Sequence, residues 1–126
     1  MFPDREIFII FVKTILMVKY EVQFLEPAKV FLDKLDNKSR EKVIFNIWKS
    51  RETNDPQLFK KLTGNIWEFR TVFNNKQFRL FAFWDKFDNK KTLVIATHGM
   101  VKKTQKTSKN EIEKAEQLRK KYFENS

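Results

Sequence analysis

The residues best suited to acid–base or phosphate chemistry gather near the end of the chain, in the segment HGMVKKTQKTSKNEIEKA. Its histidine, His98, is the only one in the sequence. Four lysines follow within the next eleven residues: Lys102, Lys103, Lys106 and Lys109. Cations beside the N-terminus of a helix oppose the helix dipole, so lysines just before a predicted helix favour a bound polyanion, and a phosphate in particular, over a structural role.

A second charged group lies on two strands that the sequence predicts as a hairpin. The segments IWEFRTVF and QFRLFAFW alternate apolar and polar residues, and Asn74–Asn75 between them predicts a two-residue turn. Matching the apolar faces of the strands places Arg70 directly across from Arg79. Two facing arginines repel each other. We therefore expect either Glu68, which shares their face, or a bound anion to compensate them.

A third strand, TLVIATH, is expected to bring the histidine into the same patch. If the preceding turn is at Asp88–Asn89, His98 lies across from Arg79. The residues of this strand that then join the core face are Leu93, Ile95 and Thr97. The alternatives are structural: a histidine at a strand end can be a packing or capping residue, and a sheet arginine can belong to an ion pair.

Helices and strands elsewhere in the chain must position these residues. The chain is expected to begin with a strand over 17–24, followed by a helix beginning near Pro27 and a second helix capped by Asp36 or Asn37. A polar connection over 52–64 then leads into the three-stranded meander. The last helix begins at Ser108, with Glu111 completing a capping box. The apolar stripe of the second helix comprises Val43, Ile44, Ile47 and Trp48. This order predicts an α+β fold, in which helices cover a small antiparallel sheet.

Composition excludes several kinds of site. The chain of 126 residues has a net charge of +10 and a pI near 9.8, which indicates a polyanionic or acidic partner. It has no cysteine, so disulfides and thiolate chemistry are excluded, and this suits a reducing cytoplasm. One histidine and dispersed carboxylates argue against a metal site, and two glycines argue against a glycine-rich phosphate loop. We expect no cofactor.

The first sixteen residues, MFPDREIFIIFVKTIL, differ in composition from the remainder of the chain. Their apolar run is too short to span a bilayer and is not followed by a signal-peptide cleavage site. Met17 comes just before the first predicted strand. We interpret residues 1–16 as an extension ahead of the natural start and residues 17–126 as a single domain. The alternative is an additional strand or helix that contributes to the core.

The segments KKLTGNIWEFRTVFNNKQFRLFAFW and LVIATHGMVKKTQKTSKNEIEKAEQLRKKY resemble the RelE/HigB superfamily of type II toxin–antitoxin toxins, and within it the phage-derived HigB-like branch. The resemblance extends from Met17 to Tyr122. It implies the RelE-like fold and a cytoplasmic, metal-independent endoribonuclease that cleaves mRNA, usually on the ribosome. It also implies a cognate antitoxin, commonly a helix-turn-helix protein.

The resemblance assigns roles to residues. Arg70 and Arg79 match basic active-site positions, Glu68 matches a motif position, and the lysines of VKKTQKT match a basic loop. The arginines would bind the scissile phosphate, because a guanidinium binds phosphate through two parallel hydrogen bonds. Protons would be handled by one of His98, Glu68, Lys102 and Lys103. The lysines expected to contact the RNA backbone are Lys60, Lys61, Lys103, Lys106 and Lys109.

Three other functions stay open at this point. A ParE-like toxin of the same fold would inhibit DNA gyrase instead of cutting RNA. A non-catalytic module would only bind nucleic acid, with Phe81 and Phe83 stacking on bases unless they pack under the last helix. A degenerate toxin would bind its antitoxin without cutting. If the arginines act on a phosphate, we expect their removal to leave the fold intact.

Overall fold

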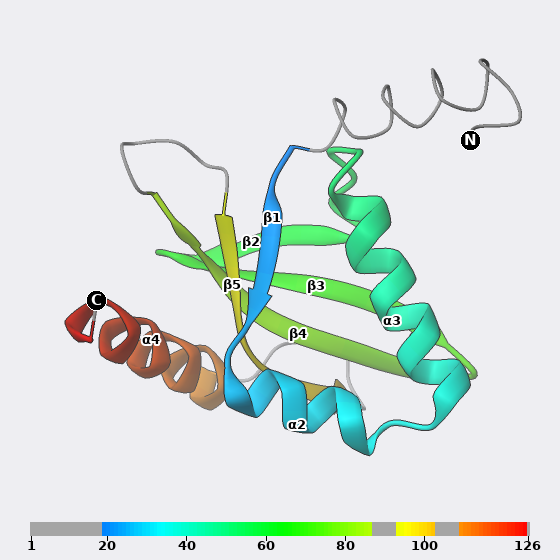
Figure 1. Cartoon of the computed structure of the whole chain (residues 1–126). Coiled ribbons are helices and arrows are strands. Elements are labelled where there is room, and N and C mark those ends of the chain that lie inside the picture. Colours follow the sequence, from blue (N-terminus) through cyan, green and yellow to red (C-terminus); the bar gives the residue numbers. More distant parts are fainter. Residues whose placement is uncertain (1–18, 87–92, 103–108, 126) are drawn as a thin grey trace, which may run out of the picture.

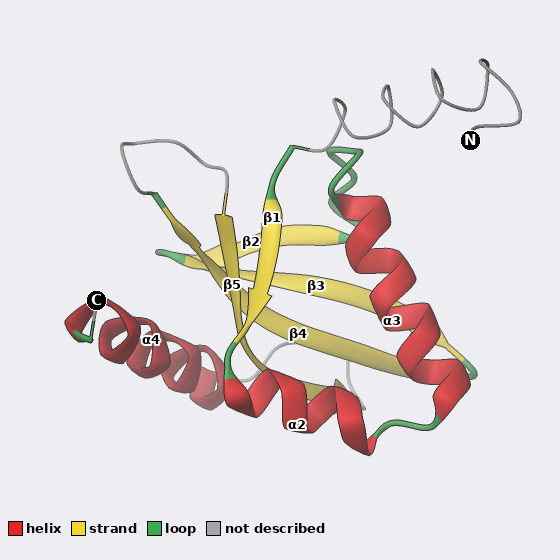
Figure 2. Ribbon diagram, viewed as in Figure 1, coloured by secondary structure: helices red, strands yellow, loops and turns green. Residues whose placement is uncertain are grey.

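The computed structural model describes residues 19–86, 93–102 and 109–125. In chain order its elements are β1 (Glu21–Phe24), α2 (Glu26–Lys34), α3 (Asn37–Ser50), β2 (Phe59–Thr63), β3 (Ile66–Phe73), β4 (Lys76–Asp85), β5 (Leu93–Lys102) and α4 (Lys109–Glu124). α2 and α3 cover one face of the sheet and α4 lies on the other (Figures 1 and 2). The predicted α+β class with a C-terminal helix is confirmed.

Several predictions fall outside the described residues. They are the extension over 1–16, the turn at Asp88–Asn89, the Ser108 cap, and the positions of Lys103 and Lys106. Within the described ranges, no helix has the length and apolar character that crossing a bilayer requires.

The first two helices begin where the sequence predicts. Pro27 occupies the first turn of α2, and the Asp36 carboxylate accepts a hydrogen bond from the Ser39 backbone N–H at 3.1 Å to cap α3. The predicted stripe on α3 holds for Val43 and Ile47, which are buried. It is wrong for Trp48, which is 57% exposed. This indole stacks instead on the guanidinium of Arg51, whose Cζ lies 4.2 Å from the ring centre.

The five strands lie in the order β1-β5-β4-β3-β2. β1 pairs in parallel with β5 and the other neighbours are antiparallel, so the sheet is mixed rather than wholly antiparallel as expected. β2 lies inside the segment predicted as a polar connection. It contributes one half-buried side chain to each core, Phe59 on the α2/α3 face and Leu62 on the α4 face, whereas Lys60 and Lys61 are exposed at the sheet edge. Its sequence therefore lacks strong apolar alternation.

The predicted register of the β3–β4 hairpin is confirmed. Asn74 and Asn75 form the turn with φ of 54° and 60°, values that asparagine tolerates better than most residues. Phe69 then lies across from Leu80, and Arg70 across from Arg79.

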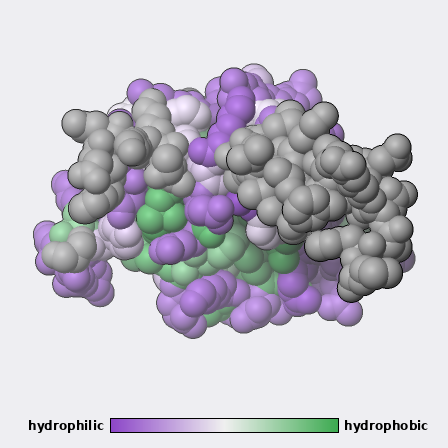
Figure 3. Space-filling model, turned by 45° about the horizontal axis from the view of Figure 1, so that its top comes forward, coloured by the Kyte–Doolittle hydropathy of each residue, from purple (hydrophilic) through white to green (hydrophobic). Residues whose placement is uncertain are grey.

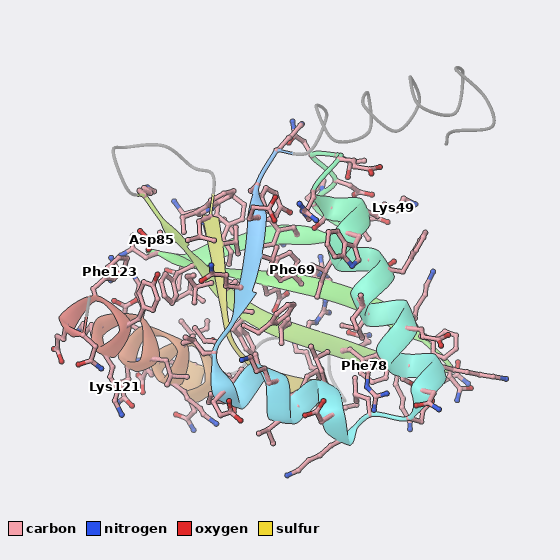
Figure 4. All side chains as sticks on the ribbon, in the orientation of Figure 1. Lys49, Phe69, Phe78, Asp85, Lys121 and Phe123 are labelled. Atoms are coloured by element: carbon pink, nitrogen blue, oxygen red, sulfur yellow. The ribbon has the colours of Figure 1, made fainter. Side chains whose placement is uncertain are left out.

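Each face of the sheet has its own apolar core. Phe69 and Phe78 pack with α2 and α3 on one face, as Figure 4 shows. Phe81 and Phe83 pack with α4 on the other. Hydrophilic side chains cover most of the described surface seen in Figure 3, with an apolar area in the middle of that face.

Candidate active site

The sheet face beneath α4 changes along its strands from apolar to charged. Ile66 on β3 and Phe81 on β4 pack into the α4 core. Side chains two residues apart on a strand share a face, so Glu68 and Arg70 continue this face on β3, and Arg79 continues it on β4. The hairpin register therefore brings these three charged residues together, beyond the α4 core.

Glu68 lies between the two arginines. Its carboxylate is buried, and its Oε1 is 3.5 Å from Arg70 Nε and 3.7 Å from Arg79 Nη1. The repulsion expected between facing arginines is thus offset by this carboxylate. We refer to Glu68, Arg70, Arg79 and Lys102 as the arginine cluster.

Arg79 is the most enclosed member of the arginine cluster. It is only 2% exposed, and its Nη2 donates to Gln77 Oε1 at 2.8 Å. Burial lowers the pKa of Arg79, Glu68 opposes that shift and Arg70 adds to it. The Nε groups of Arg79 and Arg70 are buried without a hydrogen-bond partner. Because an unsatisfied buried donor is costly, these two N–H groups are suited to an incoming oxygen ligand.

Lys102 completes the cluster from β5. It lies across from Gln77 in the β4–β5 ladder and is buried. Burial lowers the pKa of Lys102, Arg79 and Arg70 lower it further, and Glu68 opposes the shift. Lys102 therefore gives up its proton more readily than an ordinary lysine.

The burial of Arg79 changes one expectation from the sequence. Removing either arginine was expected to leave the fold intact. Arg70 is 26% exposed, and for it that expectation stands. Arg79 is buried against a buried carboxylate, so its removal takes away one of the two guanidinium groups beside Glu68 and destabilises the fold.

The predicted position of His98 across from Arg79 is wrong. Met100 lies across from Arg79, and Gly99 across from Leu80. An irregularity in the ladder between Leu80 and Ala82 shifts the register of β5 at this point. The core assignment for this strand also changes: Val94 and Ala96 join the α2/α3 core, while Leu93 and Ile95 pack against α4.

His98 instead connects β5 to α4. Its Nε2 is 2.7 Å from Glu111 Oε2, and its Nδ1 is 3.1 Å from Thr97 Oγ1. Its ring stacks on Phe81 with centroids 4.9 Å apart. Burial lowers the pKa of His98, Glu111 opposes the shift, and Lys114 adds to it. A neutral imidazole that donates from Nε2 to Glu111 accepts at Nδ1 from the Thr97 hydroxyl, whose proton is then shared with the Phe81 carbonyl oxygen 3.2 Å away.

The lysines predicted to bind RNA lie in different places. Lys60 is exposed on β2 across from Glu68, and Lys61 follows it on the strand. Lys109 is exposed at the start of α4. Of the two interpretations of Phe81 and Phe83, packing under the last helix is confirmed and base stacking is excluded, because both are fully buried under α4.

Gln77 is a site residue that the sequence interpretation missed. The signal was its position two residues before Arg79 on the same strand face, where a side-chain amide can hold a guanidinium. Within the described ranges, no group of three or more metal-ligating side chains comes together.

Comparison with known proteins identifies the family. No curated protein matches the chain. Residues 30–120 match the family described as "Phage derived protein Gp49-like (DUF891)", a range that contains the whole arginine cluster. This is a toxin-like family, and a toxin of this kind has a cognate antitoxin as its partner. The chain therefore belongs to the Gp49-like family of phage-derived proteins, a toxin-like family of the type II toxin–antitoxin kind.

Proposed function

We propose that this protein is a toxin of the RelE/HigB type, a metal-independent endoribonuclease that cleaves mRNA on the ribosome in the cytoplasm and so stops translation. The observation that carries the proposal is the arginine cluster: three cations gathered around one buried carboxylate. The net positive charge of the cluster complements a phosphodiester, and its enclosed position strengthens electrostatic interactions.

RNA supplies its own nucleophile. The 2′-hydroxyl oxygen attacks phosphorus while a base takes its proton, the bond from phosphorus to the 5′-oxygen breaks, and that oxygen takes a proton from solvent. The products are a 2′,3′-cyclic phosphate and a 5′-hydroxyl. Arg70 and Arg79 bind the non-bridging oxygens, and their Nε groups, which have no hydrogen-bond partner, are among the donors. Preorganised donors of this kind stabilise the charge that grows on those oxygens.

Lys102 is the residue that we assign as the base. Its lowered pKa and its position beside both arginines support this role. Glu68 holds the two guanidinium groups. His98 is held by Glu111 and Thr97, so we assign it a positioning role between β5 and α4 rather than proton transfer.

The antitoxin, which we propose to be a helix-turn-helix protein, covers the basic surface with acidic or apolar segments. The exposed basic residues Lys60 and Lys109, together with Lys103 and Lys106, contact the RNA or ribosomal RNA. Association with the antitoxin should slow as salt rises, because charge steers such encounters.

The test is cleavage of mRNA on programmed ribosomes. Arg70→Ala should lower the cleavage rate on the order of a hundredfold or more, with little change in unfolding temperature. The double variant with Arg79→Ala should be little slower, because groups that act as a unit are not additive. Lys49→Ala, on the outer surface of α3 (Figure 4), is the matched control and should cleave normally.

In cells, protein synthesis should fall before DNA synthesis when the toxin is expressed alone. An earlier fall in DNA synthesis, with gyrase-linked breaks, would contradict the nuclease and favour a ParE-like toxin that inhibits DNA gyrase. An unchanged cleavage rate in the Arg70→Ala protein would show that Arg70 does not bind the scissile phosphate.

A further inference from the structure

A second basic surface lies on the sheet face opposite to the arginine cluster. Trp67 is three residues before Arg70 on β3, and Trp84 is five residues after Arg79 on β4. Because strand side chains alternate, these odd spacings place both tryptophans on the other face. They line a cavity of about 620 Å³, a volume within the range of small-ligand sites. We call this cavity the tryptophan groove.

The walls of the tryptophan groove are aromatic. The Trp67 and Trp84 rings are almost perpendicular, at 88°, with centroids 5.9 Å apart. Phe59 stacks on Trp67 at 4.9 Å, and Tyr20 meets Trp84 edge-on at 5.1 Å. These contacts fix the rings, so a planar ligand that enters finds a preformed stacking surface.

The rim of the groove is basic. Lys19, Lys60 and Lys61 line it, and Lys61 and Lys86 line a smaller adjoining cavity of about 90 Å³ that shares both tryptophans. Among the described lining residues of the two cavities, the acidic one is Asp55. Aromatic walls with cations around them are the combination that binds single-stranded nucleic acid, since bases stack and phosphates pair with lysines.

Trp84 provides an independent observation. Its indole Nε1 is buried and has no hydrogen-bond partner. An indole N–H can only donate, and a buried donor without an acceptor is costly. A base carbonyl or ring nitrogen beside Trp84 would supply the missing acceptor.

We propose that the tryptophan groove binds a single-stranded stretch of RNA, separate from the phosphate held by the arginine cluster. β2 is the edge strand between the two surfaces, and Lys60 both lies across from Glu68 and lines the groove. The RNA therefore passes from the cluster around β2 into the groove. The choice of RNA over DNA rests on the proposed function; the stacking site does not.

The test uses tryptophan fluorescence in the full-length protein. Trp48→Phe removes the exposed indole on α3 and leaves Trp67 and Trp84 as the reporters. The probe is a ten-nucleotide 2′-O-methyl RNA, which has no free 2′-hydroxyl and cannot be cleaved. We expect saturable quenching, because the bases stack on the reporters, and weaker binding by a DNA oligonucleotide of the same sequence.

In that background, Trp67→Leu should weaken binding roughly five- to a hundredfold, the cost of one lost base stack. Lys61→Ala with Lys86→Ala should weaken it and make the slope of log affinity against log salt shallower by about 1.4. Lys38→Ala with Lys49→Ala on α3 is the control of equal charge and should change affinity less. The lysine variants are at exposed positions, so they test the groove even if Trp67→Leu does not fold.

Unchanged affinity in the Lys61→Ala, Lys86→Ala protein, or no quenching at saturation, would contradict the proposal that the tryptophan groove binds RNA. Tighter binding of DNA would overturn the choice of RNA. Arg70→Ala separates the two proposals: it should lower cleavage on the order of a hundredfold or more while the quenching remains. Quenching without any cleavage by the unmodified protein would contradict the proposed nuclease activity but would still support RNA binding in the tryptophan groove.

Discussion

On the α2/α3 face the strands bury apolar side chains, and polar groups under the two helices are paired, whereas Trp84 Nε1 at the tryptophan groove is not. Asn46 Nδ2 donates to Thr71 Oγ1 at 3.2 Å, and the Tyr20 and Ser50 hydroxyls are 2.7 Å apart. On the α4 face only part of each strand is apolar. Beyond it lie the charged side chains of the arginine cluster, whose two arginine Nε groups have no hydrogen-bond partner.

The difference between the two faces indicates that one contributes mainly to stability and the other to chemistry. Under α2 and α3 the core is apolar, so the residues there contribute mainly to folding. The exception on this face is the tryptophan groove, where Trp84 Nε1 has no hydrogen-bond partner. The arginine cluster brings like charges together and leaves donors unsatisfied, which destabilises a fold unless a ligand uses them. Substitutions in the α2/α3 core should therefore lower the free energy of unfolding, whereas substitutions in the arginine cluster should also change the rate of RNA cleavage. This should hold even where the two residues are neighbours on one strand.

The largest expected effect is on catalysis at Lys102. Lys102→Met should lower the rate of RNA cleavage about 10²- to 10⁴-fold if Lys102 is the base. In the unmodified protein the rate should rise with pH up to the pKa of Lys102, which burial and the two arginines hold below its usual ~10.4. The measurement is a pH–rate profile of single-turnover cleavage.

Two further variants sharpen this test. Lys102→Arg keeps the positive charge but cannot accept a proton in this pH range, so it should be nearly as slow as Lys102→Met. Lys49→Met, on the opposite side of the molecule, should keep the full profile. An Arg variant with normal activity would show that Lys102 acts only through its charge.

Glu68→Gln should have the next largest effect, and on stability. It removes the carboxylate between two guanidinium groups and leaves Arg79 buried without its counter-charge. We expect a loss of about 3–5 kcal/mol in the free energy of unfolding by urea. Glu116→Gln is the control, because its pair with Arg119 is partly exposed on α4 and should contribute less than about 1 kcal/mol. Equal losses in the two variants would mean that the cluster is solvated.

Leu80→Ala tests the other face. Leu80 follows Arg79 on β4 but points into the α2/α3 core. The cavity left by the smaller side chain should cost about 2–5 kcal/mol in unfolding free energy, while cleavage per folded molecule stays within twofold. Val72→Ala, at an exposed position of the same hairpin, should change stability by less than about 0.5 kcal/mol. A large loss of cleavage by folded Leu80→Ala protein would show that the two faces are coupled.

Local rules in the sequence predict much of this arrangement. The Asn74–Asn75 turn and apolar alternation determine the β3–β4 register, and with it the meeting of Arg70 and Arg79. The start signals of the first two helices, Pro27 for α2 and the Asp36 cap for α3, are equally local. Such features depend on neighbours in the chain, which the sequence displays directly.

Long-range features could not be predicted in the same way. Both faces of β5 are apolar, so alternation does not determine its register, and the irregularity opposite Leu80 and Ala82 has no local signal. The parallel pairing of β1 with β5 depends on the whole chain between them. The burial of Lys102 and the contact of His98 with Glu111 follow from these features.

His98→Gln should have the smallest effect of the series. Loss of the 2.7 Å contact with Glu111 should cost about 1–3 kcal/mol of stability by loosening α4 from β5. Cleavage by the folded protein should be nearly unchanged, since His98 lies outside the arginine cluster. A large loss in rate with RNA binding unchanged would instead give His98 the proton-transfer role considered from the sequence.

The pH dependence of that stability effect decides the charge of His98. Burial lowers its pKa in the folded protein below the ~6.5 of the unfolded chain, so the unfolded state binds more protons as the pH falls through 6.5. The contribution of His98 to stability is therefore present above this pH and declines in acid, where a buried imidazolium is costly. The difference in unfolding free energy between the unmodified protein and His98→Gln should shrink from pH 8 to pH 5. If it grew instead, the imidazole would be charged and paired with Glu111, because an ion pair raises the folded-state pKa and adds stability in acid.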